Sequence, residues 1–229
     1  MRVLVACEYS GIVREAFAAR GHRAVSCDLL PTEQAPGPNA SHYQGDVRDI
    51  LDWGWDLMVG HPDCTFLTNS GIRWLYEEWT GEEKAAHLAA TGQKLRGHSR
   101  RRNEARWAAM ADAVDFYRLL WESPIERIAL ENPRMHPYAQ EAIGGGPTQV
   151  IQPWQFGTPE TKATGLRLKN LPPLVERADA TEVLAYGRTL PDKVFARVHN
   201  LPPSPTRWKE RSRTFPGVGV AMAEQWGDL

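Results

Sequence analysis

Two short polar segments, each directly after an apolar run, hold the residue types that could carry out chemistry. The first is GHPDC, which ends at Cys64, and the second is ENP, which begins at Glu131. A cysteine kept only for packing would more often lie inside the apolar run. A thiolate can attack an electron-poor ring carbon, while a carboxyl group protonates or holds a ring nitrogen. If both segments end parallel strands, Cys64 and Glu131 can face one pocket, because open α/β proteins bind ligands at that edge. An inert loop thiol and a surface carboxylate are the alternatives.

The elements that would position these residues begin with a β-loop-α-turn-β unit at the start of the chain. Residues 2–7 are apolar and rich in β-branched side chains, and residues 22–28 form a second such run. Between them, residues 11–20 have helical spacing, and one face of that helix carries Ile12, Ala16 and Ala19. This order predicts a doubly wound α/β fold.

Three positions at the ends of the first strands are typical of a nucleotide-like ligand. The turn CEYSG, residues 7–11, contains a glycine that lets a ligand approach the helix N-terminus, and a plain βα turn is an equal alternative. It is not G-x-G-x-x-G, so a dinucleotide is not favoured. Asp28 is placed to accept hydrogen bonds from ribose hydroxyls, or is a solvated strand-end residue. Asp46 could accept from a purine amine, although a helix N-cap fits it better.

The second half of the chain predicts a long helix and a late antiparallel pair. Residues 103–122 form the clearest amphipathic helix, with Asn103 as its N-cap, and residues 127–132 form a strand. Residues 150–156 and 163–170 read as two strands around a turn. Residues 171–212 are poorly patterned, and the chain closes with a short helix.

A basic segment lies before the long helix. Residues 94–106 contain six Lys and Arg residues and His98 against one acidic residue, Glu104. Tryptophans flank the segment at Trp74, Trp79 and Trp107. Such a segment suits phosphate contacts in nucleic-acid binding, and the alternative is a solvated run of charge.

Composition limits the class of protein. The chain has 229 residues, a net charge of −1 and three widely separated cysteines, so a disulfide framework is not expected. No cysteine or histidine spacing indicates a metal site. No signal peptide and no run long enough to span a bilayer is apparent, so we expect a cytoplasmic protein.

Taken in order, these segments resemble the motifs of the DNA (cytosine-5) methyltransferases, in the compact form often found in phage genomes. VLVACEYSGIVREAFAARGH resembles the S-adenosylmethionine loop, CDLLP and GDVRDI the next two motifs, and HPDC the motif with the nucleophilic cysteine. ALENP resembles the motif whose glutamate holds the target base. The eighth motif resembles residues 152–174, and the last resembles FPGVGVAMAEQWG. The resemblance covers most of the chain, and its specificity lies in the ordered set.

The resemblance implies a single S-adenosylmethionine-dependent methyltransferase domain over residues 1–229, with a Rossmann-like, mostly parallel sheet and a late antiparallel strand. The implied catalytic residues are Cys64, Glu131, Lys162 and Thr164. The implied cofactor-binding residues are Glu8, Tyr9, Ser10, Gly11, Asp28, Leu29, Asp46, Val47, His61, Pro62, Gly217 and Val218. DNA contacts are expected from Arg96, Arg100, Arg101, Arg102, Arg106, Arg207, Arg211 and Arg213.

The implied reaction is C5 methylation of cytosine in double-stranded DNA, with the target base flipped out. Cys64 would add to C6 while Glu131 hydrogen-bonds N3 and the amine. The expected protein is a monomer that contacts no membrane. Its biological setting would be DNA methylation of the restriction-modification type. Residues 68–106 would form an insertion or mobile loop after the cysteine.

Several positions depart from the family pattern. Asp63 separates Pro62 from Cys64, where the family has proline next to the cysteine, and an adjacent acid disfavours the thiolate. Lys162 and Thr164 stand where the family has two arginines. Pro133 replaces the usual valine. Residues 171–212 are too short for the usual target-recognition domain and would form a reduced variable region.

Three alternatives follow from these departures. The same chemistry could act on a pyrimidine nucleotide or on RNA, although the basic segment argues against a free nucleotide. The chain could instead be a catalytically weak, DNA-binding remnant. An adenine amino-methyltransferase would need an aromatic residue after the fourth strand's proline, and Cys64 makes that less favourable.

Overall fold

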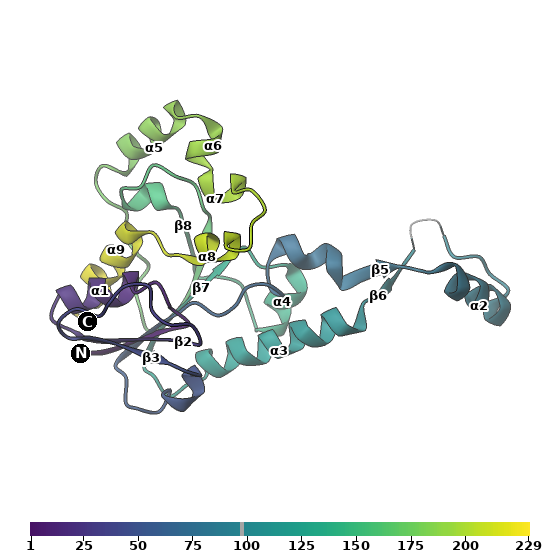
Figure 1. Cartoon of the computed structure of the whole chain (residues 1–229), viewed down its shortest axis with the longest axis horizontal. Helices are drawn as coiled ribbons and strands as arrows, with labels where there is room; N and C mark the ends of the chain where they lie inside the picture. Colours follow the sequence, from purple (N-terminus) through teal and green to yellow (C-terminus); the bar gives the residue numbers. More distant parts are fainter. Residues whose placement is uncertain (97–98) are drawn as a thin grey trace.

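A seven-stranded sheet forms the centre of the computed structural model, which describes residues 1–96 and 99–229 (Figure 1). His98 of the basic segment therefore lies outside the described residues. The strand order is β3-β2-β1-β4-β7-β9-β8. The five parallel strands are β1 (Arg2–Ala6), β2 (Arg23–Asp28), β3 (Ala40–Gln44), β4 (Leu57–Gly60) and β7 (Arg127–Pro133).

The direction of β9 (Thr164–Lys169) is reversed. It pairs antiparallel with β7 on one side and with β8 (Gln149–Ile151) on the other. The expected architecture is thereby confirmed: a mixed α/β, Rossmann-like fold with a mostly parallel sheet and a late antiparallel strand. Because β9 is reversed, its first residue reaches the edge where the parallel strands end, and Thr164 pairs with Pro133.

Each face of the sheet has its own apolar core. On one face, α1 (Ile12–Ala19) packs against α9 (Pro216–Trp226), with Phe17 and Trp226 fully buried. On the other face, α3 (Glu104–Trp121) and α4 (Pro137–Ala142) cover the sheet. The N-cap predicted at Asn103 is present, since its side chain accepts a hydrogen bond from the backbone N–H of Arg106.

The face of α1 predicted from apolar spacing is wrong. Its buried residues are Val13, Arg14, Phe17 and Ala18, whereas Ala19 is exposed and Ile12 and Ala16 are half-buried. The reason is that Arg14 lies in the interior among polar partners, which apolar periodicity does not detect.

The segment predicted as a strand over residues 150–156 is only partly one. β8 ends at Ile151, and Pro153–Phe156 form the 3-10 turn η3. Proline cannot donate to a strand ladder, and Gly157 closes the turn at φ 89°. The expected short helix after Asp46 is the 3-10 turn η1 (Val47–Asp49).

The poorly patterned stretch before the last helix is folded into short helices. They are α5 (Ala180–Thr189), α6 (Asp192–Phe195), α7 (Arg197–Asn200) and α8 (Arg207–Ser212). Val198 and Ala180 are the buried anchors of α7 and α5, and Phe195 lies close to Gly187 of α5. Because each of these helices buries so few apolar residues, the sequence shows no helical spacing of apolar residues there.

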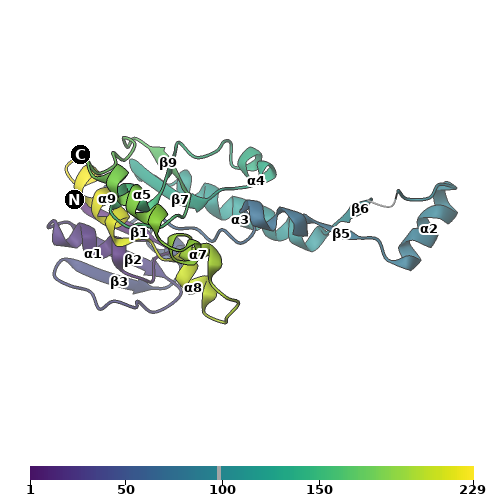
Figure 2. The ribbon, with the colours of Figure 1, turned by 90° about the horizontal axis from the view of Figure 1, so that it is seen from above.

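The segment after Cys64 forms an arm that projects from the sheet (Figures 1 and 2). The arm consists of η2 (Asn69–Leu75), β5 (Tyr76–Glu78), α2 (Gly81–Thr91) and β6 (Arg100–Arg102), with β5 and β6 antiparallel. No residue of α2 is buried, and a capping box between Thr80 and Glu83 starts the helix. Among the described residues, no helix is long and apolar enough to cross a membrane.

Replacing Gly217 with Ala should destabilise the protein. A Cβ at Gly217 would lie 1.9 Å from the carbonyl oxygen of Phe156, so the start of α9 would have to move away from η3. We expect a loss of about 1–3 kcal/mol in the free energy of unfolding, measured by urea denaturation. The matched control is Gly81→Ala, where a Cβ meets nothing within 4 Å. An equal effect in both variants would contradict this packing constraint.

Candidate active site

A cleft of about 600 Å³, counted with its open mouth, lies at the edge where the parallel strands end. Residues after β1, β4 and β7 meet there, opposite a segment that we call the strap, residues 207–214. The lining includes Cys7, Glu8, Tyr9, Ser10, His61, Pro62, Asp63, Cys64, Glu131, Pro133, Lys162, Arg211, Ser212, Arg213 and Thr214. The structure thus brings Cys64, Glu131 and Lys162 together in one cleft.

A second, much narrower cavity adjoins the cleft and shares Glu131, Lys162 and Thr214 with it. Its other walls include Thr164, the fourth residue expected to be catalytic, and Val218 of α9. The Thr164 hydroxyl donates to the carbonyl oxygen of Lys162 at 3.2 Å, so it steadies the turn that carries the lysine.

Glu131 is held by a histidine. The Nδ1 atom of His61 lies 2.6 Å from Oε2 of Glu131, and both side chains are only 10% exposed. This bond joins the ends of β4 and β7. The other ring nitrogen, Nε2, is buried and has no hydrogen-bond partner in the structure.

The surroundings of His61 and Glu131 shift both pKa values toward the charged forms. Burial opposes the charge on His61, but the hydrogen bond and charge of Glu131, together with Glu8, outweigh it and raise the pKa of His61. Burial likewise opposes the charge on Glu131, but Lys162 and His61 outweigh it and lower the pKa of the carboxyl group. Both shifts favour the charged form of their group, an imidazolium beside a carboxylate.

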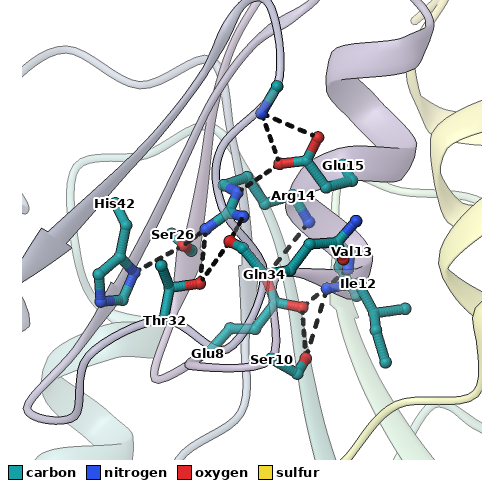
Figure 3. A network of polar contacts seen from close by, with 11 residues as sticks. Glu8, Ser10, Ile12, Val13, Arg14, Glu15, Ser26, Thr32, Gln34 and His42 are labelled. Atoms are coloured by element: carbon teal, nitrogen blue, oxygen red, sulfur yellow. Dashed lines mark hydrogen bonds and ion pairs between the residues drawn. The ribbon is translucent and has the colours of Figure 1, made fainter.

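Glu8 closes the N-terminus of α1 (Figure 3). Its carboxylate accepts hydrogen bonds from the backbone N–H groups of Val13 at 2.7 Å and Arg14 at 3.2 Å, and from the Ser10 hydroxyl at 3.1 Å. The helix end, which would otherwise attract a phosphate, already has its anion. A negative side chain in this wall favours a ligand with a cationic group over a pyrophosphate.

Arg14 ties the loop after β2 to α1 (Figure 3). Its side chain is 0% exposed and donates to the hydroxyls of Ser26 and Thr32 and to the carbonyl oxygen of Gln34. Its Nε pairs with Glu15 at 2.8 Å. The loop that follows Asp28 is therefore fixed by a buried cation with several partners.

The thiol of Cys64 is protonated in the free protein. Burial, Asp63 and Glu131 raise its pKa to about 11, and Lys162 acts in the opposite direction. This agrees with the effect expected of an acid next to the cysteine. Asp63 itself accepts hydrogen bonds from the backbone N–H and the hydroxyl of Thr65, so its carboxylate faces the loop.

The strap is fastened to the loop after β1 and to the loop after β2. The Tyr9 hydroxyl donates to the carbonyl oxygen of Lys209 at 2.7 Å and contacts the Ser212 hydroxyl at 2.9 Å. Arg213 forms an ion pair with Glu33 and a second one with Glu210. The Nζ of Lys162 donates to the backbone carbonyl of Arg213, which links the strap to this lysine.

Several residues expected to bind the cofactor lie outside both cavities. Asp28 accepts a hydrogen bond from the N–H of Leu30, and burial raises the pKa of its carboxyl group. Asp46 caps η1 and pairs with Arg48, the alternative role considered for it. The side chain of Leu29 is exposed and that of Val47 is buried. Gly11 is the N-cap of α1, with φ 78°. Gly217 has no Cβ, which allows the carbonyl oxygen of Phe156 to approach its backbone closely.

The arginines expected to contact DNA have different surroundings. Arg101 is paired with Glu77 and Glu83, while Arg102 is paired with Glu104 and stacks on Trp107. Arg106 donates to the carbonyl oxygen of Thr65. Arg213 is paired with Glu33 and Glu210, and Arg211 lines the cleft. Arg96 and Arg100 are exposed on the arm, and Arg207 begins α8.

Sequence reasoning missed several residues of the site. Cys7 belongs to the turn at residues 7–11 but was not among the expected cofactor-binding residues; it lines the cleft, and its left-handed backbone, φ 59°, was not foreseen. Ser212 and Thr214 come from the poorly patterned region. His61 was expected to contact the cofactor, and its bond to Glu131 was not foreseen. Its position three residues before Cys64, at the same strand edge as Glu131, was the available signal.

Comparisons with known proteins give little sequence support. No protein-family model matches the chain, and no curated protein is significantly similar to it. Among solved structures, a prophage-encoded E. coli protein described as a DNA modification methyltransferase is 15% identical, with a TM-score of 0.42 over 73% of this chain. The methyltransferase EhMeth of Entamoeba histolytica is 12% identical, with a TM-score of 0.41 over 77%. The matches cover 46% and 55% of those chains, so this chain spans about half their length.

Replacing Asp63 with Asn should make Cys64 more reactive. Removal of the neighbouring charge lowers the pKa of the thiol, so we expect alkylation by iodoacetamide at about pH 8 to become roughly two- to tenfold faster. Lys162→Met should slow the same reaction, because the lysine favours the thiolate. Peptide mass spectrometry separates Cys64 from Cys7 and Cys27. Identical rates in all three proteins would refute this electrostatic account.

The stability contributed by the His61–Glu131 pair should depend on pH. The lowered pKa of Glu131 contributes stability above its ordinary value of 4.5, which is lost as the pH falls through the lowered pKa. The raised pKa of His61 contributes stability below its ordinary value of 6.5, which is lost as the pH rises through the raised pKa. Both contributions are therefore present together between pH 4.5 and 6.5.

His61→Asn tests this dependence, because asparagine keeps an N–H donor near the position of Nδ1 but carries no charge. We expect the loss in free energy of unfolding, relative to the native chain, to be largest in that pH window and to shrink toward about pH 9. Urea denaturation across the pH range measures it. A loss that stays constant with pH would mean that the charge on His61 contributes nothing.

Proposed function

We propose that the chain is an S-adenosylmethionine-dependent DNA (cytosine-5) methyltransferase that uses Cys64 as its nucleophile. The observation that carries this proposal is the convergence of Cys64, Glu131 and Lys162 in one cleft at the ends of the parallel strands. A thiol and an ionised carboxylate facing the same space suit covalent addition to a pyrimidine ring that is held by its edge. The order of the sequence motifs supports the same reaction.

The residues around the first loop fit S-adenosylmethionine. Glu8 presents a carboxylate at the end of α1, which suits a sulfonium and an ammonium group and opposes a phosphate. Asp28, after β2, uses Oδ1 for the N–H of Leu30 and has Oδ2 for a ribose hydroxyl. When bound, S-adenosylmethionine supplies the electrophilic methyl group.

Cys64 has to lose its proton before it adds to C6 of cytosine. With a pKa of about 11, the thiol needs help, and Lys162 is the neighbouring cation that stabilises the thiolate. The lysine thus takes over part of the electrostatic work that the family assigns to arginine. After methyl transfer, loss of the C5 proton expels Cys64.

Glu131 would hold the N3 and amine edge of the base and draw electrons from the ring. His61 acts through Glu131: its hydrogen bond to Oε2 fixes one carboxylate oxygen and leaves Oε1 for the base. Thr164 supports the lysine turn and lines the adjoining cavity. We therefore regard His61 and Thr164 as positioning residues for this reaction.

DNA is the substrate class that the charge distribution favours. Residues 68–106 hold eight Lys and Arg against five Asp and Glu, whereas the rest of the chain holds 19 against 23. We propose that this insertion, together with Arg207 and Arg211 near the cleft, contacts the DNA backbone. Residues 171–212 would then form a reduced variable region in place of a target-recognition domain. We propose that the protein acts as a monomer in the cytoplasm.

The protonated state of Cys64 favours one rival, a catalytically weak DNA-binding remnant. A second rival keeps the chemistry but uses a pyrimidine nucleotide or RNA, and the short variable region supports it. A duplex containing 5-fluorocytosine separates them, since a working enzyme forms a covalent complex that resists denaturing gel electrophoresis. A remnant would bind the duplex without trapping. Activity on dCMP or RNA but not on the duplex would identify the other substrates.

Cells that lack their own cytosine methylation provide the decisive test. We expect 5-methyldeoxycytidine in the DNA of cells that express the native protein and none with Cys64→Ala, measured by nucleoside mass spectrometry. Lys162→Met should reduce the yield by at least about tenfold, because the thiolate loses its stabilising cation. Equal methylation with the native chain and Cys64→Ala would overturn the proposal. So would the absence of 5-methyldeoxycytidine from both samples.

A further inference from the structure

An arginine and a tryptophan form an exposed stack in η2, at the root of the arm. The guanidinium carbon of Arg73 lies 4.6 Å from the ring centroid of Trp74, and the tryptophan is 55% exposed. The indole therefore offers a solvent-exposed aromatic surface next to a cation. The core of the arm root uses other aromatic residues, Tyr76, Trp107 and Tyr138. Trp74 is therefore not needed to anchor the arm.

The backbone between Cys64 and η2 is firmly held. A Cβ at Gly71 would lie 3.2 Å from the carbonyl oxygen of Thr65, so η2 folds back onto the residue next to the cysteine. Arg106 donates to the same carbonyl oxygen at 3.2 Å, and the N–H of His136 donates to Leu67 at 3.0 Å. The Arg73–Trp74 stack is thus fixed relative to Cys64.

A second cation, Arg106, lies against η2, with its Nη2 atom 3.4 Å from the position of a Cβ at Gly71. Arg106 lies 4.3 Å from the ring centroid of Phe66, two residues after Cys64, and the surplus of basic over acidic residues in residues 68–106 is three. An indole with a guanidinium beside it can take a nucleobase, and the neighbouring cations suit phosphates. An acidic peptide would match the charge but would not use a flat aromatic surface.

We propose that Arg73 and Trp74 form a stacking site for an unpaired base of the DNA strand that reaches the cleft. The site deepens the proposed function, because it names the part of the DNA that is recognised, an unstacked base next to the target. A flipped cytosine breaks the base stack on both sides of its position, and an aromatic surface held near Cys64 offers a replacement for the lost stacking. Binding at this site does not require methyl transfer.

Fluorescence anisotropy with labelled oligonucleotides at low salt tests the site in the full-length chain. Because a base–aromatic stack is worth about 1–3 kcal/mol, Trp74→Ala should weaken binding of a single strand, or of a duplex with one abasic position, by about 5- to 150-fold. Trp74→Phe should retain most of the affinity. The matched control is Trp53→Ala. The native Trp53 side chain is 47% exposed and packs on Trp55 after η1.

The outcomes are distinct. Loss with Trp74→Ala but not with Trp53→Ala supports the site, whereas equal affinities, or equal losses in both variants, overturn it. Failure of the native chain to bind any oligonucleotide also overturns it, and tighter binding of RNA than of DNA overturns its assignment to DNA. If Trp74 governs DNA binding but no 5-methyldeoxycytidine is formed, the site stands and the proposed methyl transfer fails.

Discussion

The site depends on four ionisable side chains of alternating charge that line the cleft. Glu8, His61, Glu131 and Lys162 come from four separate segments, and Glu8 and Glu131 are almost fully removed from water. An isolated charge would be too costly there, so each is tolerated only because the next one offsets it. The constraint is geometric as well as electrostatic, since the sheet has to bring four strand ends to one edge. The reversed β9 serves this purpose by placing Lys162 beside Glu131.

The parts of this arrangement that could be predicted from the sequence are those that short local patterns, such as apolar runs, indicate. The strands that carry Cys64 and Glu131, and the N-cap of α3 at Asn103, follow from local patterns. The missing parts depend on contacts between distant residues. Arg14 is buried because it has polar partners as far as 20 residues away in the sequence, such as Gln34. Tyr9 binds Lys209 of the strap, which is 200 residues later in the sequence. The spacing of apolar residues within a short segment contains no information about such distant contacts.

The arm shows why a count of basic residues is a poor measure of a binding surface. Arg101 and Arg102 belong to the densest basic run in the sequence, yet both have acidic partners, Arg101 within the arm and Arg102 at the start of α3. Their charge helps to fold β5 and β6 onto each other and onto α2. Arg73 was not part of that run, and it lies on an open aromatic ring close to the site. Which charges face a ligand is decided by side-chain pairing.

The strap has a consequence for the order of events. Thr214 lines both cavities, and the strap is held by Tyr9 in the loop after β1 and by the pairing of Arg213 with Glu33 in the loop after β2. A ligand that lies behind the strap has to arrive before the strap closes and cannot depart until those bonds break. Local opening of a short, sparsely anchored helix costs far less than global unfolding. Opening of the strap would therefore expose the cleft at a smaller free-energy cost than unfolding of the sheet.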